Sequence, residues 1–104
     1  MPHHPDQDIV VERLVTAFAP ERVLLFGSWA RGTATEDSDL DLLVIVESDE
    51  PIHRRMARAQ SALRGLTTPA DVFVVTPAEV EEYKDWLSHT IAIALREGQE
   101  LYAA

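Results

Sequence analysis

Apolar residues in this chain follow strand spacing in some segments and helical spacing in others. Three short segments are almost continuously apolar, which predicts buried strands, at residues 22–26, 39–46 and 71–75. Longer segments repeat an apolar residue every three or four positions, which predicts helices, at residues 6–18, 51–65 and 77–98. The alternation of the two patterns predicts an α/β (α+β) domain of two layers, with helices packed on a sheet.

Polar and turn-forming residues set the limits of these elements. Thr76 and Glu79 predict a helix start with a reciprocal capping box. A break near residues 86–88 would divide the last helix into two, and the sequence leaves both versions open. Residues 28–32 predict a short helical turn, and residues 99–102 predict a short fourth strand at a sheet edge.

The helix over residues 51–65 has an apolar side and a basic side. The apolar stripe is expected to face the core and consists of Ile52, Met56, Ala59, Leu63 and Leu66. The polar side holds a cluster of arginines, Arg54, Arg55, Arg58 and Arg64. Such a cluster is ordinarily a solvated face, with partner docking or phosphate contact as the alternative. The last predicted helix has a similar apolar face, formed by Val80, Tyr83, Leu87, Ile91, Ala94 and Leu95.

Two carboxylates, Asp39 and Asp41, open the second predicted strand. Side chains alternate along a strand, so both are expected on the same face. Close carboxylates repel each other, and a divalent cation relieves that repulsion. Oxygen ligands favour Mg²⁺ or Mn²⁺ over zinc. A solvated pair at a strand start is the ordinary alternative, but Asp is depleted in strands.

Gly27 and Ser28 lie about ten residues before this pair, directly after the first predicted strand. A glycine lets the backbone approach a ligand closely, and a helix start offers donors to an anion. The ordinary alternatives are a strand-ending turn for Gly27 and a helix cap for Ser28. A phosphate site facing a metal site is the layout of phosphoryl or nucleotidyl transfer.

Other polar and aromatic residues give weaker signals. Arg31 lies one helical turn after Ser28, where it would reach a phosphate or pair with Glu36 or Asp37. Trp29 is expected to pack against the protein rather than to stack on a nucleotide base. The four histidines show no zinc spacing; His3 and His4 are expected in a mobile tail, and His53 and His89 are isolated.

Length and composition limit the partners and the compartment. The chain has 104 residues, which predicts one domain over residues 1–104. Its net charge of −9 repels a polyanion, so a nucleic acid is a poor candidate acceptor and a basic protein suits better. There is no cysteine, no leader-like segment and no apolar run long enough for a membrane, which together predict a cytoplasmic protein.

The residues Phe26–Gly32 and Asp37–Val44 together resemble the signature of the DNA polymerase β-like nucleotidyltransferase superfamily. More narrowly, they resemble the minimal nucleotidyltransferases, small prokaryotic proteins commonly paired with HEPN-domain toxins. The motif residues cover roughly a fifth of the chain, and the expected element order extends the resemblance over nearly all of it. The resemblance implies a nucleotidyltransferase fold with a three-stranded mixed core sheet.

The resemblance also implies roles for individual residues. Asp39 and Asp41 would hold the catalytic Mg²⁺ or Mn²⁺, and Gly27, Ser28 and Arg31 would bind ATP. Asp71, which opens the third predicted strand, would complete the carboxylate cluster as a metal ligand or as the base for an attacking hydroxyl. From its own residue type, Asp71 is equally compatible with a simple turn.

The activity implied is transfer of AMP from ATP to a tyrosine of a HEPN ribonuclease toxin, with this chain as the antitoxin. Larger relatives carry an additional domain that helps to hold the acceptor, and the acceptor surface is expected here from another polypeptide. A binding antitoxin without transferase activity is the alternative. Transfer to a small molecule such as an aminoglycoside is a weaker one.

Overall fold

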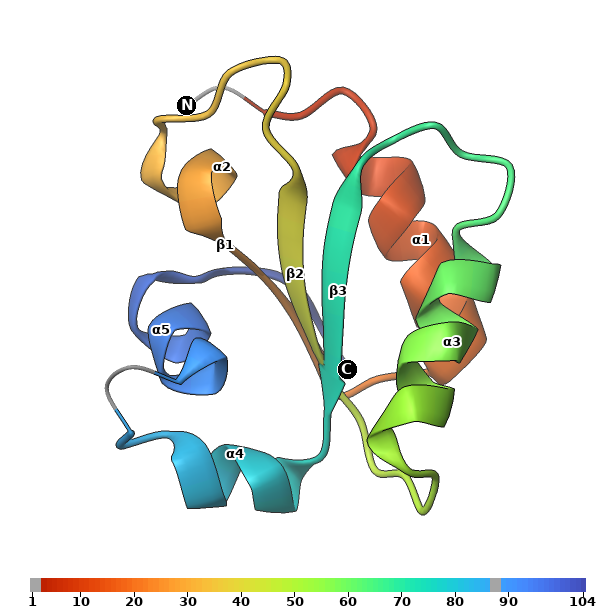
Figure 1. The fold of residues 1–104 in the computed structure, drawn as a ribbon, viewed down its shortest axis with the longest axis vertical. Coiled ribbons are helices and arrows are strands. Elements are labelled where there is room, and N and C mark those ends of the chain that lie inside the picture. The colour runs from red at the N-terminus through yellow and green to blue at the C-terminus, as the bar shows by residue number, and fades with distance from the viewer. Residues whose placement is uncertain (1–2, 87–88) are drawn as a thin grey trace.

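A four-stranded sheet forms the centre of the molecule (Figure 1). The computed structural model describes residues 3–86 and 89–104. The spatial order of the strands is β3-β2-β1-β4, with bounds β1 Arg22–Phe26, β2 Leu40–Ile45, β3 Ala70–Val75 and β4 Gln99–Ala103. β2 runs parallel to β3, and β1 runs antiparallel to both β2 and β4. The predicted mixed sheet and its fourth edge strand are therefore confirmed.

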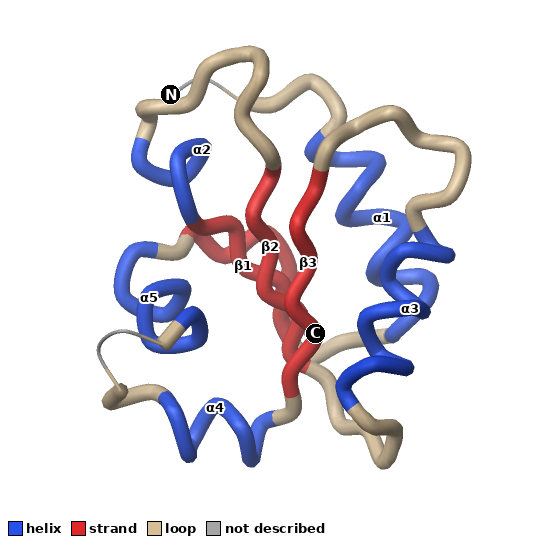
Figure 2. The backbone as a smooth tube through the Cα atoms, in the orientation of Figure 1, coloured by secondary structure: helices blue, strands red, loops and turns tan. Residues whose placement is uncertain are grey.

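Helices cover both faces of this sheet, as Figure 2 shows, so the domain has three layers and not the expected two. One face carries α1 (Gln7–Phe18) and α3 (Ile52–Ala62), which contact each other. The other face carries α4 (Pro77–Tyr83) and α5 (Thr90–Glu97), and the short α2 (Gly27–Arg31) contacts α5 at the end of β1. Within the described residues, no helix is long and apolar enough to cross a membrane.

The alternation of side chains along the strands divides the core in two. Leu25 and Leu42 pack in the cluster that includes α1 and α3, whereas Leu24 and Leu43 pack in the cluster that includes α5. Asp41 is two residues before Leu43, so it lies on the α5 side of β2. Strand periodicity therefore decides which face of the sheet receives the acidic side chains.

Three expectations about α3 are wrong. Ile52, placed on the buried stripe, is 57% exposed, and Arg55, placed on the polar side, is only 5% exposed. The helix also ends at Ala62, earlier than residue 65. Its buried side runs through Arg55 and Ala59 because the arginine finds hydrogen-bond partners that make its burial tolerable.

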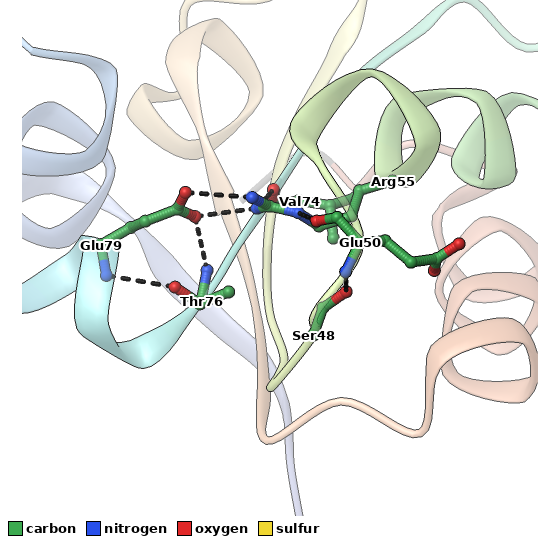
Figure 3. A network of polar contacts seen from close by, with 6 residues as sticks. All are labelled: Ser48, Glu50, Arg55, Val74, Thr76 and Glu79. Atoms are coloured by element: carbon green, nitrogen blue, oxygen red, sulfur yellow. Dashed lines mark hydrogen bonds and ion pairs between the residues drawn. The ribbon is translucent and has the colours of Figure 1, made fainter.

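The partners of Arg55 join three segments at the end of β3 (Figure 3). Its guanidinium binds the Glu79 carboxylate through both terminal nitrogens, at 2.8 and 3.0 Å. It also donates to the carbonyl oxygens of Val74 (2.7 Å) and Glu50 (3.0 Å). Glu79 closes the predicted capping box with Thr76, which is confirmed. The same carboxylate therefore starts α4 and satisfies the buried arginine.

The last predicted helix is two helices, and the residue before the second one has a clear role. α4 ends at Tyr83 and α5 begins at Thr90, while Leu87, expected on the apolar face, lies outside the described residues. His89 is not isolated: its Nδ1 accepts a hydrogen bond from the Ile91 amide, and its ring stacks 4.3 Å from that of Tyr83.

The expectation for the N-terminal histidines is also wrong for one of them. His4 is 7% exposed, and its ring lies edge-on to Trp29 with centroids 4.8 Å apart. His3, in contrast, is largely exposed and lies 3.4 Å from Asp8. The segment before α1 is therefore packed onto α2 through His4.

Replacing Arg55 with methionine should lower the free energy of unfolding by about 2–4 kcal/mol, because two carbonyls and a carboxylate lose their donor. Arg58→Met is the matched control: it removes a pair with Glu50 whose side chains are 48% and 33% exposed, and should cost less than about 1 kcal/mol. Urea denaturation of both variants measures the difference. Equal losses would show that Arg55 acts as an ordinary surface arginine.

Candidate active site

Three strand ends meet where the acidic residues lie. The parallel register sets Asp41 of β2 beside Asp71 of β3. The antiparallel register sets Phe26, the last residue of β1, opposite Asp41. Asp39 lies just before β2, which begins at Leu40. The turn after β1 and the carboxylates that begin the two neighbouring strands therefore share one end of the sheet.

The backbone of Gly27 lies against the Asp41 side chain. Its φ is +74°, and a Cβ placed on it would lie 2.0 Å from Oδ2 of Asp41. Both the backbone angle and the lack of space therefore require glycine. The alternative that Ser28 is a helix cap is wrong, because Phe26 is the N-cap of α2 and no side chain caps that helix. Ser28 is half-buried beside Gly27.

Negative charge accumulates around Asp41. Burial raises the pKa of this carboxyl above its ordinary 3.8, and the charges of Asp71 and Asp39 raise it further. Arg31 acts in the opposite direction, and Glu97 adds to the increase. The three acids expected from the sequence thus interact as one electrostatic cluster, which a bound cation would stabilise.

The cluster is not a preformed ligand cage. Among residues 3–86 and 89–104, no three His, Asp or Glu side chains form a group placed to hold a metal ion. Asp41 is half-buried, whereas Asp39 and Asp71 are exposed at the surface. The donor set nevertheless fits Mg²⁺, which proteins commonly hold through one or two carboxylates together with substrate phosphates.

The partner of Arg31 is neither Glu36 nor Asp37, so that alternative is wrong. Arg31 Nη1 lies 2.9 Å from Oε1 of Glu97, at the end of α5. The same oxygen accepts a hydrogen bond from the Gly27 amide at 3.3 Å. No local pattern in the sequence reveals the role of Glu97, because its partners are 66 and 70 residues away along the chain.

Trp29 packs against the core, as expected, and also fixes the loop that leads to the acids. Its Nε1 donates to the Ser38 carbonyl at 3.0 Å. The Ser38 hydroxyl in turn accepts a hydrogen bond from the Thr35 amide at 2.9 Å. Asp39 therefore directly follows Ser38, whose backbone and side chain are both fixed by hydrogen bonds.

A cavity of about 190 Å³ lies between α3 and β3, and Asp71 is one of the residues that line it. Its lining includes Met56 and Gln60 from α3 and Phe73 from β3. The cavity lies at β3, the edge strand of the sheet.

Residues 8–102 match the family model of the nucleotidyltransferase domain. A Sulfolobus solfataricus protein proposed to be a nucleotidyltransferase is 23% identical, with a TM-score of 0.65 over 93% of this chain and 77% of its own. A toxin–antitoxin structure with AMP-PNP is 19% identical, with a TM-score of 0.68 over 95% and 74%. A mutant of the toxin–antitoxin pair MntA–HpeT is 15% identical, with a TM-score of 0.64 over 94% and 73%. No curated protein matches the chain.

Asp41→Asn should raise the free energy of unfolding at pH 7, because it removes a charge that burial and two neighbouring acids disfavour. The native state holds the Asp41 proton more tightly than the unfolded chain, so the wild type loses relative stability as the pH rises through the raised pKa. The two proteins should therefore converge in stability as the pH falls below the ordinary value of 3.8.

Urea denaturation between pH 3 and pH 7 measures this difference. Asp49→Asn makes the same charge change at an exposed residue before α3 and should leave stability nearly unchanged. A less stable Asp41→Asn variant at pH 7 would show that the carboxylate stabilises the native fold.

Proposed function

The chain belongs to the nucleotidyltransferase domain family, and on this basis we propose that it transfers AMP from ATP to a protein acceptor, as the cytoplasmic antitoxin of a toxin–antitoxin pair. The observation that carries the proposal is the contact between the Gly27 backbone and the Asp41 carboxylate, with Asp71 beside it. This contact would bring a phosphate-binding turn directly against a cation-binding cluster.

Asp39, Asp41 and Asp71 would hold Mg²⁺ or Mn²⁺. The bound cation would neutralise charge on the triphosphate and on the pyrophosphate that leaves. The raised pKa of Asp41 supports this assignment, because burial and then the charges of Asp71 and Asp39 disfavour its carboxylate, which a bound cation would stabilise. Losing the central carboxylate should therefore affect the transfer more than it affects folding.

The turn after β1 would hold the phosphates. Its groups are the Gly27 amide, the Ser28 hydroxyl and the Arg31 guanidinium, which lie within one short helix. These donors would place the α-phosphate next to Asp41, which the Gly27 backbone already contacts. Positioning of this kind is the main protein contribution to phosphoryl transfer.

The acceptor would be a tyrosine hydroxyl entering beside Asp71. In the reaction, the tyrosine oxygen forms a bond to the α-phosphorus, and the bond from that phosphorus to the bridging oxygen of the β-phosphate breaks. Pyrophosphate leaves, and the proton of the hydroxyl passes to a base. Asp71 would act as this base or as a metal ligand; its exposure and its place beside Asp41 support either role.

A toxin partner is supported by the fold neighbours, which include toxin–antitoxin structures, one of them with AMP-PNP. The sequence resemblance to minimal nucleotidyltransferases points to a HEPN-domain toxin. The net charge of −9 suits a basic protein better than a nucleic acid. Because toxin–antitoxin pairs are complexes, an antitoxin that silences its toxin by binding alone is the second candidate.

Nucleotide binding should depend on Gly27 beyond its effect on the fold. Gly27→Ala and Gly65→Ala each put alanine at a positive φ, +74° and +90°, and the backbone angle alone should cost each variant roughly 1–2 kcal/mol of stability. A Cβ added at Gly65 would have no atom within 4 Å, whereas a Cβ at Gly27 would displace Asp41. Calorimetric titration with AMP-PNP and Mg²⁺ should show at least about tenfold weaker binding for Gly27→Ala alone. Equal affinities would contradict the site.

Incubation of the chain with ATP, Mg²⁺ and the toxin encoded beside it should increase the toxin's mass by one or more AMP units, on tyrosine. Asp41→Asn should slow this modification by orders of magnitude, because several kcal/mol of charge stabilisation is lost. The Asp41→Asn variant should still form a complex with the toxin. Mass spectrometry measures the outcome. If the toxin is silenced without a change in mass, and Asp41→Asn silences it equally well, the chain is a binding antitoxin and not an enzyme.

A further inference from the structure

Glu97 occupies the groups that the triphosphate would need. A single carboxylate oxygen, Oε1, contacts the Gly27 amide at 3.3 Å and Arg31 Nη1 at 2.9 Å. These are two of the three donors assigned to the nucleotide. An anionic side chain therefore already lies where an anionic ligand would bind.

The position of Glu97 is built into the fold. α5 begins at the His89 cap and is held in the core by Ile91 and Ala94. Gly98 follows Glu97, and a Cβ there would lie 2.1 Å from the Ala94 carbonyl oxygen and 3.3 Å from that of Leu25. The chain then continues directly into β4, which pairs with β1. The end of α5 is thus pressed against the strand that leads to Gly27.

We propose that Glu97 is an internal competitor of the nucleotide: its carboxylate holds the Gly27 amide and Arg31 in the free protein and gives them up to the phosphates on binding. The inference rests on the proposed nucleotide site. Its consequence is that the site binds nucleotide more weakly than its donors alone would allow, because only the fraction of molecules with Glu97 displaced is competent.

Three properties of the Glu97 contact favour its displacement by the nucleotide over a permanent structural role. The Glu97 side chain is 30% exposed and that of Arg31 is 51% exposed, so water can solvate both when they separate. The amide contact is long, at 3.3 Å, which indicates a weak hydrogen bond. Glu97 also adds negative charge beside Asp41, which repels a phosphate in the same space.

The test is the affinity for AMP-PNP with Mg²⁺, and for inorganic tripolyphosphate without metal, in titration calorimetry. Glu97→Gln keeps the side-chain size and removes the charge, and it should bind both probes about two- to fivefold more tightly, the range for a partly exposed ion pair. Glu97→Ala should show the same direction, and melting curves verify that both variants fold.

Glu100→Gln is the matched control. Glu100 pairs with Arg22 at 2.6 Å and its side chain is 45% exposed, and this substitution changes the net charge by the same amount. The affinity of the variant for both probes should equal that of the wild type, which separates the local contact from the overall charge.

The outcomes distinguish the inference from the proposed function. If the wild type binds AMP-PNP and the Glu97 variants bind it equally or more weakly, the competitor role is wrong, and weaker binding shows that Glu97 positions Arg31. If Glu100→Gln tightens binding as much as Glu97→Gln, net charge is the cause and the inference fails. If neither the wild type nor any variant binds AMP-PNP, the proposed function itself fails.

Discussion

The contact between the Gly27 backbone and the Asp41 carboxylate is the constraint on which the rest of this site depends. It arises because β1 and β2 are antiparallel neighbours, so the residue that leaves β1 lies opposite the residues that begin β2. The contact requires glycine and places a carboxylate against the backbone of the turn. It also leaves Asp41 partly buried next to other acids. The geometry of one turn therefore explains the local sequence, the local charge and the proposed chemistry.

The repulsion among the acids and the main stabilising polar contacts lie at opposite ends of the sheet. The acids gather where β2 and β3 begin, whereas the Arg55 network ties the far end of β3 to α3 and α4. Hydrogen bonds from Arg55 lower the pKa of Glu79, so this pair adds stability that is lost only as the pH falls below the ordinary range of glutamate. Between the two ends, an apolar core lies on each face of the sheet. The fold tolerates repulsion among the acids at one end of the sheet because the polar groups at the other end are hydrogen-bonded.

The sequence was informative wherever a signal is local. The strands, the Thr76 capping box and the Gly27 turn each follow from residues within a few positions of one another. The burial of Arg55 and the contacts of Glu97 leave no local signal, because their ion pairs span 24 and 66 residues. An arginine on a helix is solvated by default, and no neighbour in the sequence reveals a carboxylate that reaches it through the fold. The periodicity of the sequence therefore predicts the strands and helices but not the long-range polar contacts.

Gly98 has a consequence for how variation in this chain should be understood. It is the single residue between α5 and β4, and its missing side chain lets the helix end reach β1. A substitution there would shift Glu97 and, through it, the surroundings of Gly27 and Arg31. In a saturation mutagenesis experiment selected for activity, Gly98 would therefore group with residues that touch substrate, although it contacts none. Mutational sensitivity alone would overstate the extent of the active site in the direction of α5.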